Sequence, residues 1–368
     1  MQKSSQDVVI TCATRTGIGK YNGMWSKVQA HDLGKLVIKD LLKQTAIDHD
    51  QIDQVILGQV LTSNVGQNPA RQAAIGANIP NEKVSYIVNQ VCGSGLRAIV
   101  LAYQSILLKE SKIIIAGGQE SMTNSIHDQM MKDGLTDAFY NYHMGVTAEN
   151  VAAKYNISRQ EQDEFALQSQ LKANIAINKK KFDDEIINDD IDEHPRNGIT
   201  INDLSKLNSV FKEKGTVTPG NSSGINDGAA AVVLTTRELA EKNNLEILGK
   251  IISWATCGVD PSMMGLGPIP SSNKALEIAK WNVKDLDLIE INEAFAAQSI
   301  AVIKELKVPK EKVNVNGGAI ALGHPIGASG ARIVVTLLNE LKKISGKKGL
   351  ATLCIGGGMG ISMCIEKD

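Results

Sequence analysis

The chain has 368 residues, 43% hydrophobic and 21% charged, which is long enough for roughly two or three domains with a substantial core. Its 39 Lys and Arg balance 40 Asp and Glu, whereas nucleic-acid-binding proteins normally carry a basic excess or a basic face. No apolar run approaches the ~18 residues that a membrane-spanning helix needs. We therefore expect neither nucleic acid nor a membrane as a partner.

Cysteine usage and the start of the chain favour a reducing compartment. The five cysteines are odd in number and form no C-x-x-C pair, so neither a disulfide framework nor a zinc site fits their spacing. The polar residues 1–7 lead directly into an apolar strand pattern, without the features of a signal peptide. We expect a cytoplasmic enzyme that holds no metal.

The first elements alternate between strands and helices. The pattern predicts a strand over residues 9–14, a helix over 35–42 and a strand over 55–58. A further helix follows Ser94, where apolar residues recur at the helical period, and 112–116 is a short buried strand bounded by glycines. This alternation is typical of α/β layers with largely parallel strands.

A polar, charged segment then interrupts the pattern from about residue 121 to 222. It contains helical patterns over 145–154 and 159–176, and its charged run over 179–185 is expected to form a solvated face. An apolar strand over 229–236 follows. We predict that this segment is an inserted loop domain and that the later strand completes the first α/β unit.

The C-terminal part of the chain repeats the N-terminal part imperfectly. Five segments match in the same order: 9–14 with 252–256, 35–42 with 274–281, 55–58 with 289–292, 93–100 with 328–335, and 114–118 with 353–357. Because the order is preserved, we predict a duplicated core packed about a pseudo-two-fold axis. The predicted parts are an N-terminal core (1–120), the insert (121–222), completion of the N-terminal core (223–245) and a C-terminal core (246–368).

Cys92, in the segment Asn89–Gly95, stands just before a predicted helix. The helix dipole and the unpaired backbone N–H groups there favour a thiolate. The neighbouring glycines would allow a sharp strand-to-helix turn that exposes the sulfur. Cys92 is therefore a candidate nucleophile, and the alternative is a small buried hydrophobic residue, as most cysteines are.

Three residues in the second copy are candidate partners. His324 lies in the loop before the equivalent helix, where two-fold packing would bring it to Cys92 as an activating base, although a loop His bonded to a carbonyl is the alternative. Cys354 ends a strand before a run of glycines whose N–H groups could form an oxyanion hole, but alone it fits a core position. Asn292, after another strand, is either a turn former or a residue that orients a water.

These segments together resemble the thiolase family. The resemblance is carried by Asn89–Gly95, Asn292–Phe295, Gly323–Gly327 and Cys354–Gly358, with 224–229 and 316–319 in support, and it covers nearly the whole chain in collinear order. It implies an α/β fold with a duplicated, αβαβα layered core and an inserted loop domain. Within the family the chain is most similar to the biosynthetic branch, which condenses two acetyl-CoA molecules into acetoacetyl-CoA and CoA.

The resemblance also implies residue roles. Cys92 would accept the acetyl group, His324 would activate it, and Cys354 would remove an α-proton from the second acetyl-CoA. A water held by Asn292, together with His324, would stabilise one thioester oxyanion, and the backbone N–H groups of Cys92 and Gly356 would stabilise the other. Splitting the reaction through an acyl-enzyme is physically sound, and no metal or organic cofactor is required.

Substrate contacts follow from the same resemblance. His143, Met144, Met264 and Phe295 match positions that line a pocket for a short acyl chain, although a Met alone is more often core filler. Arg196 resembles the residue that stacks on the adenine of coenzyme A. Ser223 resembles the residue that contacts the pantetheine arm.

Compared with the family, the insert is shorter in two places. One lies between Asn124 and Asp133, where tetrameric members carry the loop that joins two dimers, so we expect a homodimer. The other, between Ile187 and Asp192, leaves the placement of Arg196 open.

Three alternative functions stay open at this point. They are a 3-ketoacyl-CoA thiolase with a broader chain range, a coenzyme A-binding scaffold with weak activity, and a ketoacyl or hydroxymethylglutaryl synthase-like enzyme. Those synthases do not pair the nucleophile with a second Cys in a C-x-G-G-G context, which Cys354 provides here.

Overall fold

The computed structural model describes residues 4–368, so residues 1–3 of the predicted N-terminal core lie outside the described residues. The first α/β unit contains β1 (Val8–Arg15), β2 (Gly19–Lys20), α1 (Ala30–Thr45), β3 (Gln54–Gly58), α2 (Pro69–Gly76), β4 (Val84–Val88), α3 (Ser94–Leu107), β5 (Ile113–Ser121), β6 (Asn226–Thr236) and α8 (Arg237–Lys242). The strands and helices predicted for this part of the chain are present.

The second unit follows the same sequence of elements. It contains β7 (Gly249–Gly258), α9 (Pro268–Ala279), β8 (Leu288–Ile291), α10 (Ala296–Leu306), α11 (Ala319–Leu322), α12 (Ser329–Lys343), β9 (Lys348–Ile355) and β10 (Met359–Glu366). The five matched sequence segments thus fall on β1 and β7, α1 and α9, β3 and β8, α3 and α12, and β5 and β9. The internal repeat is therefore structural.

Strand order confirms the duplication. The strands run in the order β4-β3-β5-β6-β1-β7-β10-β9-β8, with β2 added beside β6. From the middle outward, the first half runs β1, β6, β5, β3, β4 and the second half runs β7, β10, β9, β8. In each half, the first strand of the unit is therefore innermost and its last strand lies next to it. The halves join through a short antiparallel contact in which Val9 pairs with Lys250 and Ile10 with Gly249. In the second half, a parallel bridge between Ile289 and Val313 takes the position of β4.

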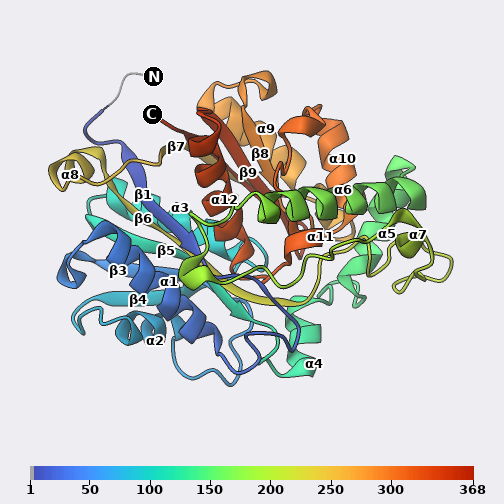
Figure 1. Cartoon of the computed structure of the whole chain (residues 1–368), viewed down its shortest axis with the longest axis horizontal. Coiled ribbons are helices and arrows are strands. Elements are labelled where there is room, and N and C mark those ends of the chain that lie inside the picture. Colours follow the sequence, from blue (N-terminus) through green and yellow to red (C-terminus); the bar gives the residue numbers. More distant parts are fainter. Residues whose placement is uncertain (1–3) are drawn as a thin grey trace.

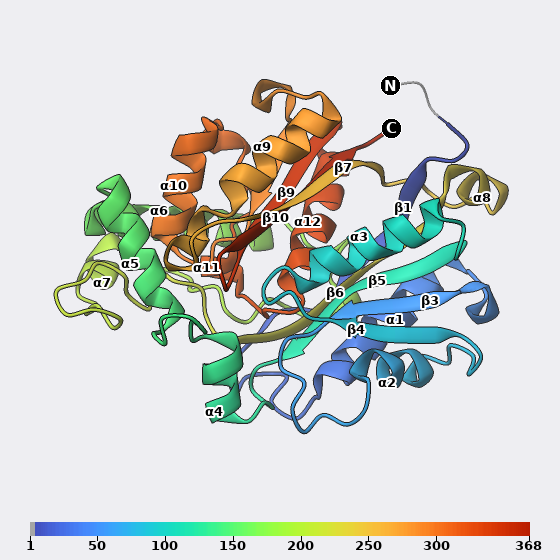
Figure 2. The same cartoon turned by 180° about the vertical axis from the view of Figure 1, so that it is seen from behind.

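Helices cover both faces of each half-sheet (Figures 1 and 2). Helices α1 and α2 lie outside the first half, and α9 and α10 lie outside the second. Helices α3 and α12 pack against each other between the two halves. The order is thus helix, sheet, helix, sheet, helix, the α/β architecture expected from the sequence.

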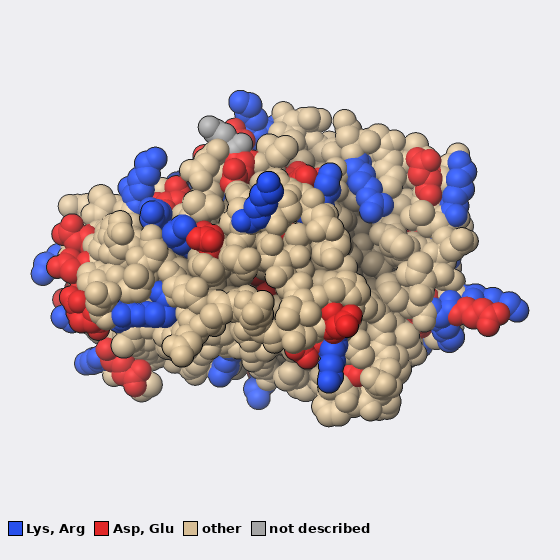
Figure 3. All heavy atoms as spheres, turned by 90° about the horizontal axis from the view of Figure 1, so that it is seen from below, with Lys and Arg blue, Asp and Glu red and all other residues tan. Residues whose placement is uncertain are grey.

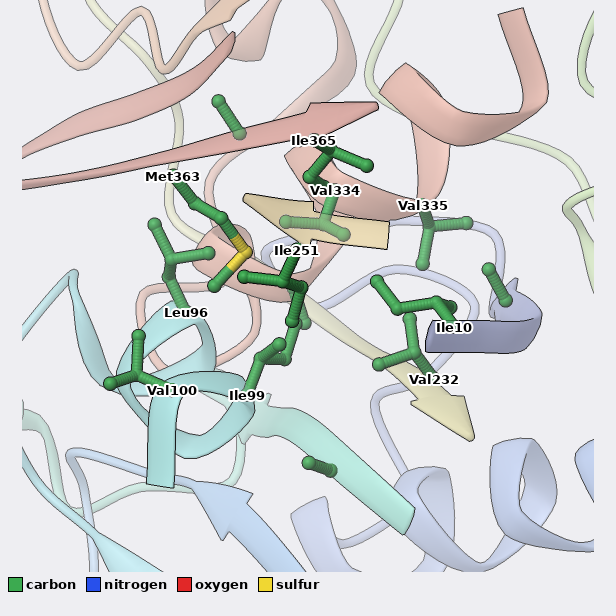
Figure 4. Close-up of a cluster of buried hydrophobic side chains, with 14 of the residues drawn as sticks. Ile10, Leu96, Ile99, Val100, Val232, Ile251, Val334, Val335, Met363 and Ile365 are labelled. Atoms are coloured by element: carbon green, nitrogen blue, oxygen red, sulfur yellow. The ribbon is translucent and has the colours of Figure 1, made fainter. Parts of the chain in front are cut away.

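The central helices are largely buried. Helix α12 buries even Arg332, which pairs with Glu290 of β8 at 3.1 Å, and both helices turn apolar residues toward the sheets. In α3 and α12 these residues pack with side chains from strands of both halves (Figure 4). The labelled members of this core are Ile10, Leu96, Ile99, Val100, Val232, Ile251, Val334, Val335, Met363 and Ile365. By contrast α1 is amphipathic, and only the stripe that includes Leu33, Val37 and Leu41 is buried.

Helices α3 and α12 approach each other most closely at two glycines in equivalent positions of the repeat, Gly95 and Gly330. A Cβ atom on Gly95 would lie 2.8 Å from the backbone nitrogen of Ala331, and one on Gly330 would lie 2.4 Å from that of Leu96. Real Cβ atoms essentially never make such contacts. Glycine at both positions therefore allows the N-terminal turns of the two helices, and the loops before them, to meet.

The insert lies between β5 and β6. It contains α4 (His127–Gln129), a π-helical turn (Met130–Gly134), α5 (Met144–Tyr155), α6 (Arg159–Asn178) and α7 (Ile201–Ser205). Helix α6 begins with a capping box in which Ser158 and Glu161 bond each other's backbone N–H groups. The two helices predicted in this segment, over 145–154 and 159–176, are α5 and α6.

One part of the insert differs from the expected solvated face. Lys179, Lys180, Asp183 and Asp184 are exposed, but Glu185 is buried. The reason is the buried Arg15 of β1, whose guanidinium lies 2.7 Å from a carboxylate oxygen of Glu185 and 2.7 and 2.8 Å from the two of Asp192. These bonds fasten the insert to the core.

The molecular surface matches the balanced composition. Basic and acidic side chains are interspersed over the face drawn in Figure 3. Among residues 4–368, no helix is both long and apolar enough to cross a bilayer.

Replacing Gly330 by Ala should lower the free energy of unfolding by about 1–3 kcal/mol, the usual cost of overpacking a filled core. The added methyl group would meet the backbone of Leu96. Gly258→Ala is the control, because its nearest neighbour would lie at 3.8 Å, an ordinary contact. Denaturant unfolding measures both variants. Equal midpoints for Gly330→Ala and the unmodified protein would contradict the account of the helix crossing.

Candidate active site

Cys92 lies in a tight turn between β4 and α3. Val91 adopts the left-handed conformation (φ +47°), which is unfavourable for a β-branched residue. The Ser94 hydroxyl stabilises the turn by donating to the Val91 carbonyl at 2.6 Å and accepting from the Gln90 N–H at 2.9 Å. The sharp turn predicted from the sequence is present, but Val91 provides it.

The glycine next to Cys92 has a different role from the one expected. Gly93 has an ordinary helical φ of −77°, so it does not make the bend. A Cβ atom on Gly93 would lie 2.5 Å from the side chain of Ile355, at the end of β9. Gly93 is therefore needed because a strand of the second copy passes close to the Cys92 turn.

Cys92 is a neutral thiol in this structure. Although it is partly exposed to a cavity, burial raises its pKa to about 11. The backbone N–H groups of Gly356 and of Cys92 itself bond the sulfur and lower the pKa, while the charge of Glu120 raises it. The N–H groups at the helix N-terminus favour the thiolate, as expected, but desolvation outweighs them in the free protein.

His324 enters from the loop before α12. Gly323, at φ +108°, makes the preceding bend in a conformation that favours glycine. The backbone N–H of His324 donates to Asn226 Oδ1 at 2.9 Å. The loop is thereby fixed to the start of β6, a strand of the first copy.

Hydrogen bonds determine which ring nitrogen of His324 carries no proton. The Ser329 hydroxyl donates its only proton to the Pro325 carbonyl at 2.9 Å, so it accepts from His324 Nδ1–H at 2.5 Å. Nε2 then carries the lone pair and faces Asn292 Nδ2 at 3.4 Å. Burial, aided by the charge of Arg332, lowers the pKa of His324 to about 3. The imidazole is thus neutral, and Nε2 is its unprotonated nitrogen.

Asn292 and Cys354 complete the group. Asn292 is fully buried behind His324, and its Oδ1 has no hydrogen-bond partner among the described residues. Asn292 contacts His324, which lines the cavity, but Asn292 itself is not part of the lining. Cys354, near the end of β9, does line the cavity, and burial raises the pKa of its thiol well above the ordinary value. Negative charge on Cys92 would raise it further.

A cavity of about 380 Å³ brings most of the predicted residues together. Its lining includes Cys92, His143, Met144, Arg196, Ser223, Met264, Phe295, His324, Cys354 and Gly356. Residues from both copies and from the insert therefore meet at one cavity. Of the predicted residues, only Asn292 stands behind the lining.

The far wall of the cavity is apolar and aromatic. Met144, Met264 and Phe295 belong to one buried cluster. His143 stacks on Phe211, with ring centroids 4.5 Å apart, and Phe211 meets Phe295 edge-to-face at 6.3 Å. Burial lowers the pKa of His143, so this ring is neutral as well. The wall thus suits a short apolar group.

The mouth of the cavity carries one net positive charge. Arg196 lines both the cavity and an adjoining groove, in which Lys20 is paired with Glu193 at 3.4 Å. The backbone N–H of Arg196 donates to Gln170 of α6 at 2.8 Å, which holds this residue at the mouth. Nearby, the Ser223 N–H donates to the Ala294 carbonyl at 3.0 Å. A ligand that combines phosphates with a short acyl group fits this arrangement.

Sequence models of the thiolase N-terminal and C-terminal domains match residues 8–238 and 245–367. The chain belongs to the thiolase family. The acetyl-CoA acetyltransferase of Rhizobium meliloti (strain 1021) is 52% identical over 391 residues, covering 99% of this chain and all of the relative. The cytosolic acetyl-CoA acetyltransferase of Mus musculus is 48% identical, and both chains are covered completely.

A solved structure agrees. The crystal structure of the Bacillus anthracis acetyl-CoA acetyltransferase superposes with a TM-score of 0.96 at 41% identity, covering 98% of this thiolase and 99% of that chain. The 391-residue alignment with the Rhizobium protein exceeds the 368 residues of this thiolase, so the alignment contains gaps in this chain.

Several residues of this thiolase site carry no recognisable sequence signal. Phe211 lies in a polar stretch without periodicity, so nothing marks it as a cavity residue. Val91 reads as an ordinary strand residue, and only its backbone angle reveals the turn. Glu120, which raises the pKa of Cys92, is recognisable only from its tertiary contacts. A sequence pattern identifies chemistry-bearing residues more readily than the residues that support them.

Alkylation of Cys92 by iodoacetamide should accelerate continuously from pH 7 to pH 10, because the raised pKa keeps the thiol protonated and the reactive thiolate increases with pH. Mass spectrometry of the Cys92 peptide provides the rate at each pH. A plateau already reached at pH 7 would show a preformed thiolate and contradict this assignment.

Proposed function

We propose that this thiolase is an acetyl-CoA acetyltransferase, which condenses two acetyl-CoA molecules reversibly into acetoacetyl-CoA and CoA. The observation that carries the proposal is the cavity in which Cys92, Cys354 and neutral His324 meet. The relatives named acetyl-CoA acetyltransferase, similar over their whole length, support it.

In the first half-reaction, Cys92 becomes acetylated. His324 Nε2 takes the thiol proton while the sulfur attacks the thioester carbonyl of acetyl-CoA. The bond between the carbonyl carbon and the CoA sulfur breaks, and the departing thiolate takes the proton of Cys354. The N–H groups of Cys92 and Gly356, which bond the Cys92 sulfur in the free protein, are suitably placed for the acyl oxygen.

In the second half-reaction, a carbon–carbon bond forms. The Cys354 thiolate left by the first step removes an α-proton from the second acetyl-CoA. His324, now protonated, and a water held by Asn292 stabilise the enolate oxygen. The enolate carbon attacks the acetyl carbonyl, the bond to Cys92 breaks, and His324 returns the proton to the sulfur. All protons are accounted for, and the proposed steps use no metal or organic cofactor.

The apolar wall favours a short acyl chain. Met144, Met264 and Phe295 line the cavity and belong to the same buried cluster as Cys354. Arg196 at the mouth would contact the adenine end of coenzyme A, and Ser223 would contact its pantetheine arm. The alternatives are a 3-ketoacyl-CoA thiolase with a broader chain range and a coenzyme A-binding scaffold with weak activity.

Mixing the protein with acetyl-CoA should place one acetyl group on Cys92, detectable by mass spectrometry of the peptide. Cys92→Ser should show no such adduct. Cys354→Ser should retain the adduct and lose condensation by about two or more orders of magnitude, because the α-proton then has no base.

The same assay separates the alternatives. Hexanoyl-CoA should acylate Cys92 poorly, whereas a broad-range thiolase would be acylated equally well by both thioesters. A scaffold would bind acetyl-CoA without forming an adduct. Absence of the adduct in the unmodified protein would overturn the proposed function.

A homodimer is proposed as the working assembly. Strand β4 lies at the edge of the sheet, paired on one side only with β3. Val84 and Tyr86 of this strand are 56% and 38% exposed. An unpaired apolar edge strand is a template for pairing with another chain. A dimer is favoured over a tetramer because the segment between Asn124 and Asp133 is short where, by the resemblance to the family, tetrameric members carry the loop that joins two dimers.

We also propose a cytoplasmic location. The mouse relative carries the word cytosolic in its name, which is consistent with the five free thiols of this chain.

Light scattering at micromolar concentration should give the mass of two chains. Val84→Lys should shift the protein toward monomers, because a charge on the edge strand opposes pairing. Lys83→Arg, on the same strand flank, should leave the mass unchanged. A stable tetramer would contradict the proposed assembly.

A further inference from the structure

Glu120 is a buried carboxyl group that the proposed reaction does not use. It lies near the end of β5 and is fully inaccessible to solvent. Its Oε2 accepts from the N–H groups of Val60 and Gly327, both at 2.9 Å, and its Oε1 accepts from that of Leu61 at 3.2 Å. Among the described residues, no Lys, Arg or His forms an ion pair with it. Three backbone N–H groups replace a cation as its partners.

These bonds connect the two copies beside the active site. Val60 and Leu61 follow β3 of the first copy, whereas Gly327 belongs to the turn between His324 and Ser329 of the second. That turn also holds His324 through the Ser329 hydroxyl. A single carboxylate therefore joins the loop beneath Cys92 to the loop that carries the base.

The fit around Gly327 is close on both sides of its peptide. A Cβ atom on Gly327 would lie 2.7 Å from Glu120 Oε2, and one on Gly118 of β5 would lie 2.0 Å from the Gly327 carbonyl oxygen. Cys92 packs against the apolar cluster that contains Val60 and Ile326. The end of β5 is thus the surface on which the His324 turn rests, with Cys92 nearby.

We propose that Glu120 is a positioning residue for the acetyl transfer. As a carboxylate it holds the His324 turn against the first copy. This role rests on the proposed function, whereas the effect of its charge on Cys92 is a property of the free protein.

The charge state of Glu120 agrees with this role. Burial raises its pKa to about 7, against the three N–H groups, which lower it. The groups that face it electrostatically are Asp227 of β6, which raises its pKa, and Cys92, whose own pKa it raises. Above pH 7 the carboxylate accepts all three bonds. Protonation below pH 7 removes acceptor capacity and frees the turn, so kcat should rise with pH through about 7.

The test compares Glu120→Gln with Glu120→Asp. Gln keeps the shape but removes the charge and presents an NH₂ group to a backbone N–H. We expect kcat to fall by about 10²-fold with KM for acetyl-CoA within about twofold, since misplacement of a catalytic group costs on this order. The pH midpoint of Cys92 alkylation, measured without acetyl-CoA, should move to lower pH, because the like charge of Glu120 raises the pKa of the Cys92 thiol.

Glu120→Asp separates reach from charge. It keeps the charge but is too short to hold the loops, so kcat should fall while the alkylation midpoint stays near that of the unmodified protein. Glu149→Gln is the matched control, because Glu149 is also buried and accepts from the N–H groups of Thr216 and Val217 at 2.7 and 2.8 Å. It should leave the alkylation midpoint unchanged.

Two results would overturn the proposal. One is an unchanged alkylation midpoint in folded Glu120→Gln, and the other is an unchanged kcat in Glu120→Asp. If Glu120→Gln fails to fold, the Asp variant alone decides. Failure of the unmodified protein to condense acetyl-CoA would overturn the proposed function instead, and the alkylation experiment would still test the effect of the charge.

Discussion

The close approach of α3 and α12 determines the rest of the site. The two helices meet at Gly95 and Gly330, where any side chain would collide with the backbone of the other helix. Because the helices are equivalent elements of a duplicated unit, their N-terminal ends meet near the pseudo-two-fold axis. The turn before one carries Cys92 and the loop before the other carries His324. Two residues far apart in the sequence therefore share a cavity.

The duplication also explains why the two copies carry different chemistry. In the aligned repeat, Cys92 corresponds to Gly327, which lies two residues before the start of α12, as Cys92 lies two before the start of α3. The first copy thus presents a thiol at this position, and the second presents a bare peptide N–H that bonds Glu120. The second copy supplies the base and the other thiol instead. The fold around the axis is nearly symmetric, but a few side-chain differences between the two copies make the active site asymmetric.

Desolvation sets the resting state of the site. Burial raises the pKa of both cavity thiols and lowers that of His324, so the neutral forms of all three groups are favoured. A neutral thiol beside a neutral imidazole is protected from unproductive reactions, and the donors already present become useful when charge develops on the substrate. The cost is that proton transfer must accompany attack, which makes the position of His324 Nε2 critical.

Much of this arrangement was predictable from the sequence, and the exceptions have physical reasons. The ordered repeats predicted the duplicated α/β core, and the glycine-rich motifs marked Cys92, His324 and Cys354. The helices of the insert followed from their periodicity. The protonation state of Cys92 was not predictable, because desolvation depends on neighbours from both copies. The burial of Glu185 was missed because its partner, Arg15, lies in a distant strand. Phe211 and Glu120 act through tertiary contacts alone.

A crystal structure of the protein treated with acetyl-CoA tests the central claim most directly. The account predicts an acetyl group on the Cys92 sulfur, its oxygen within hydrogen-bond distance of the N–H groups of Cys92 and Gly356 and its methyl group toward Met264 and Phe295. An acetyl group on another residue, or an acetyl oxygen directed away from both N–H groups, would contradict the account.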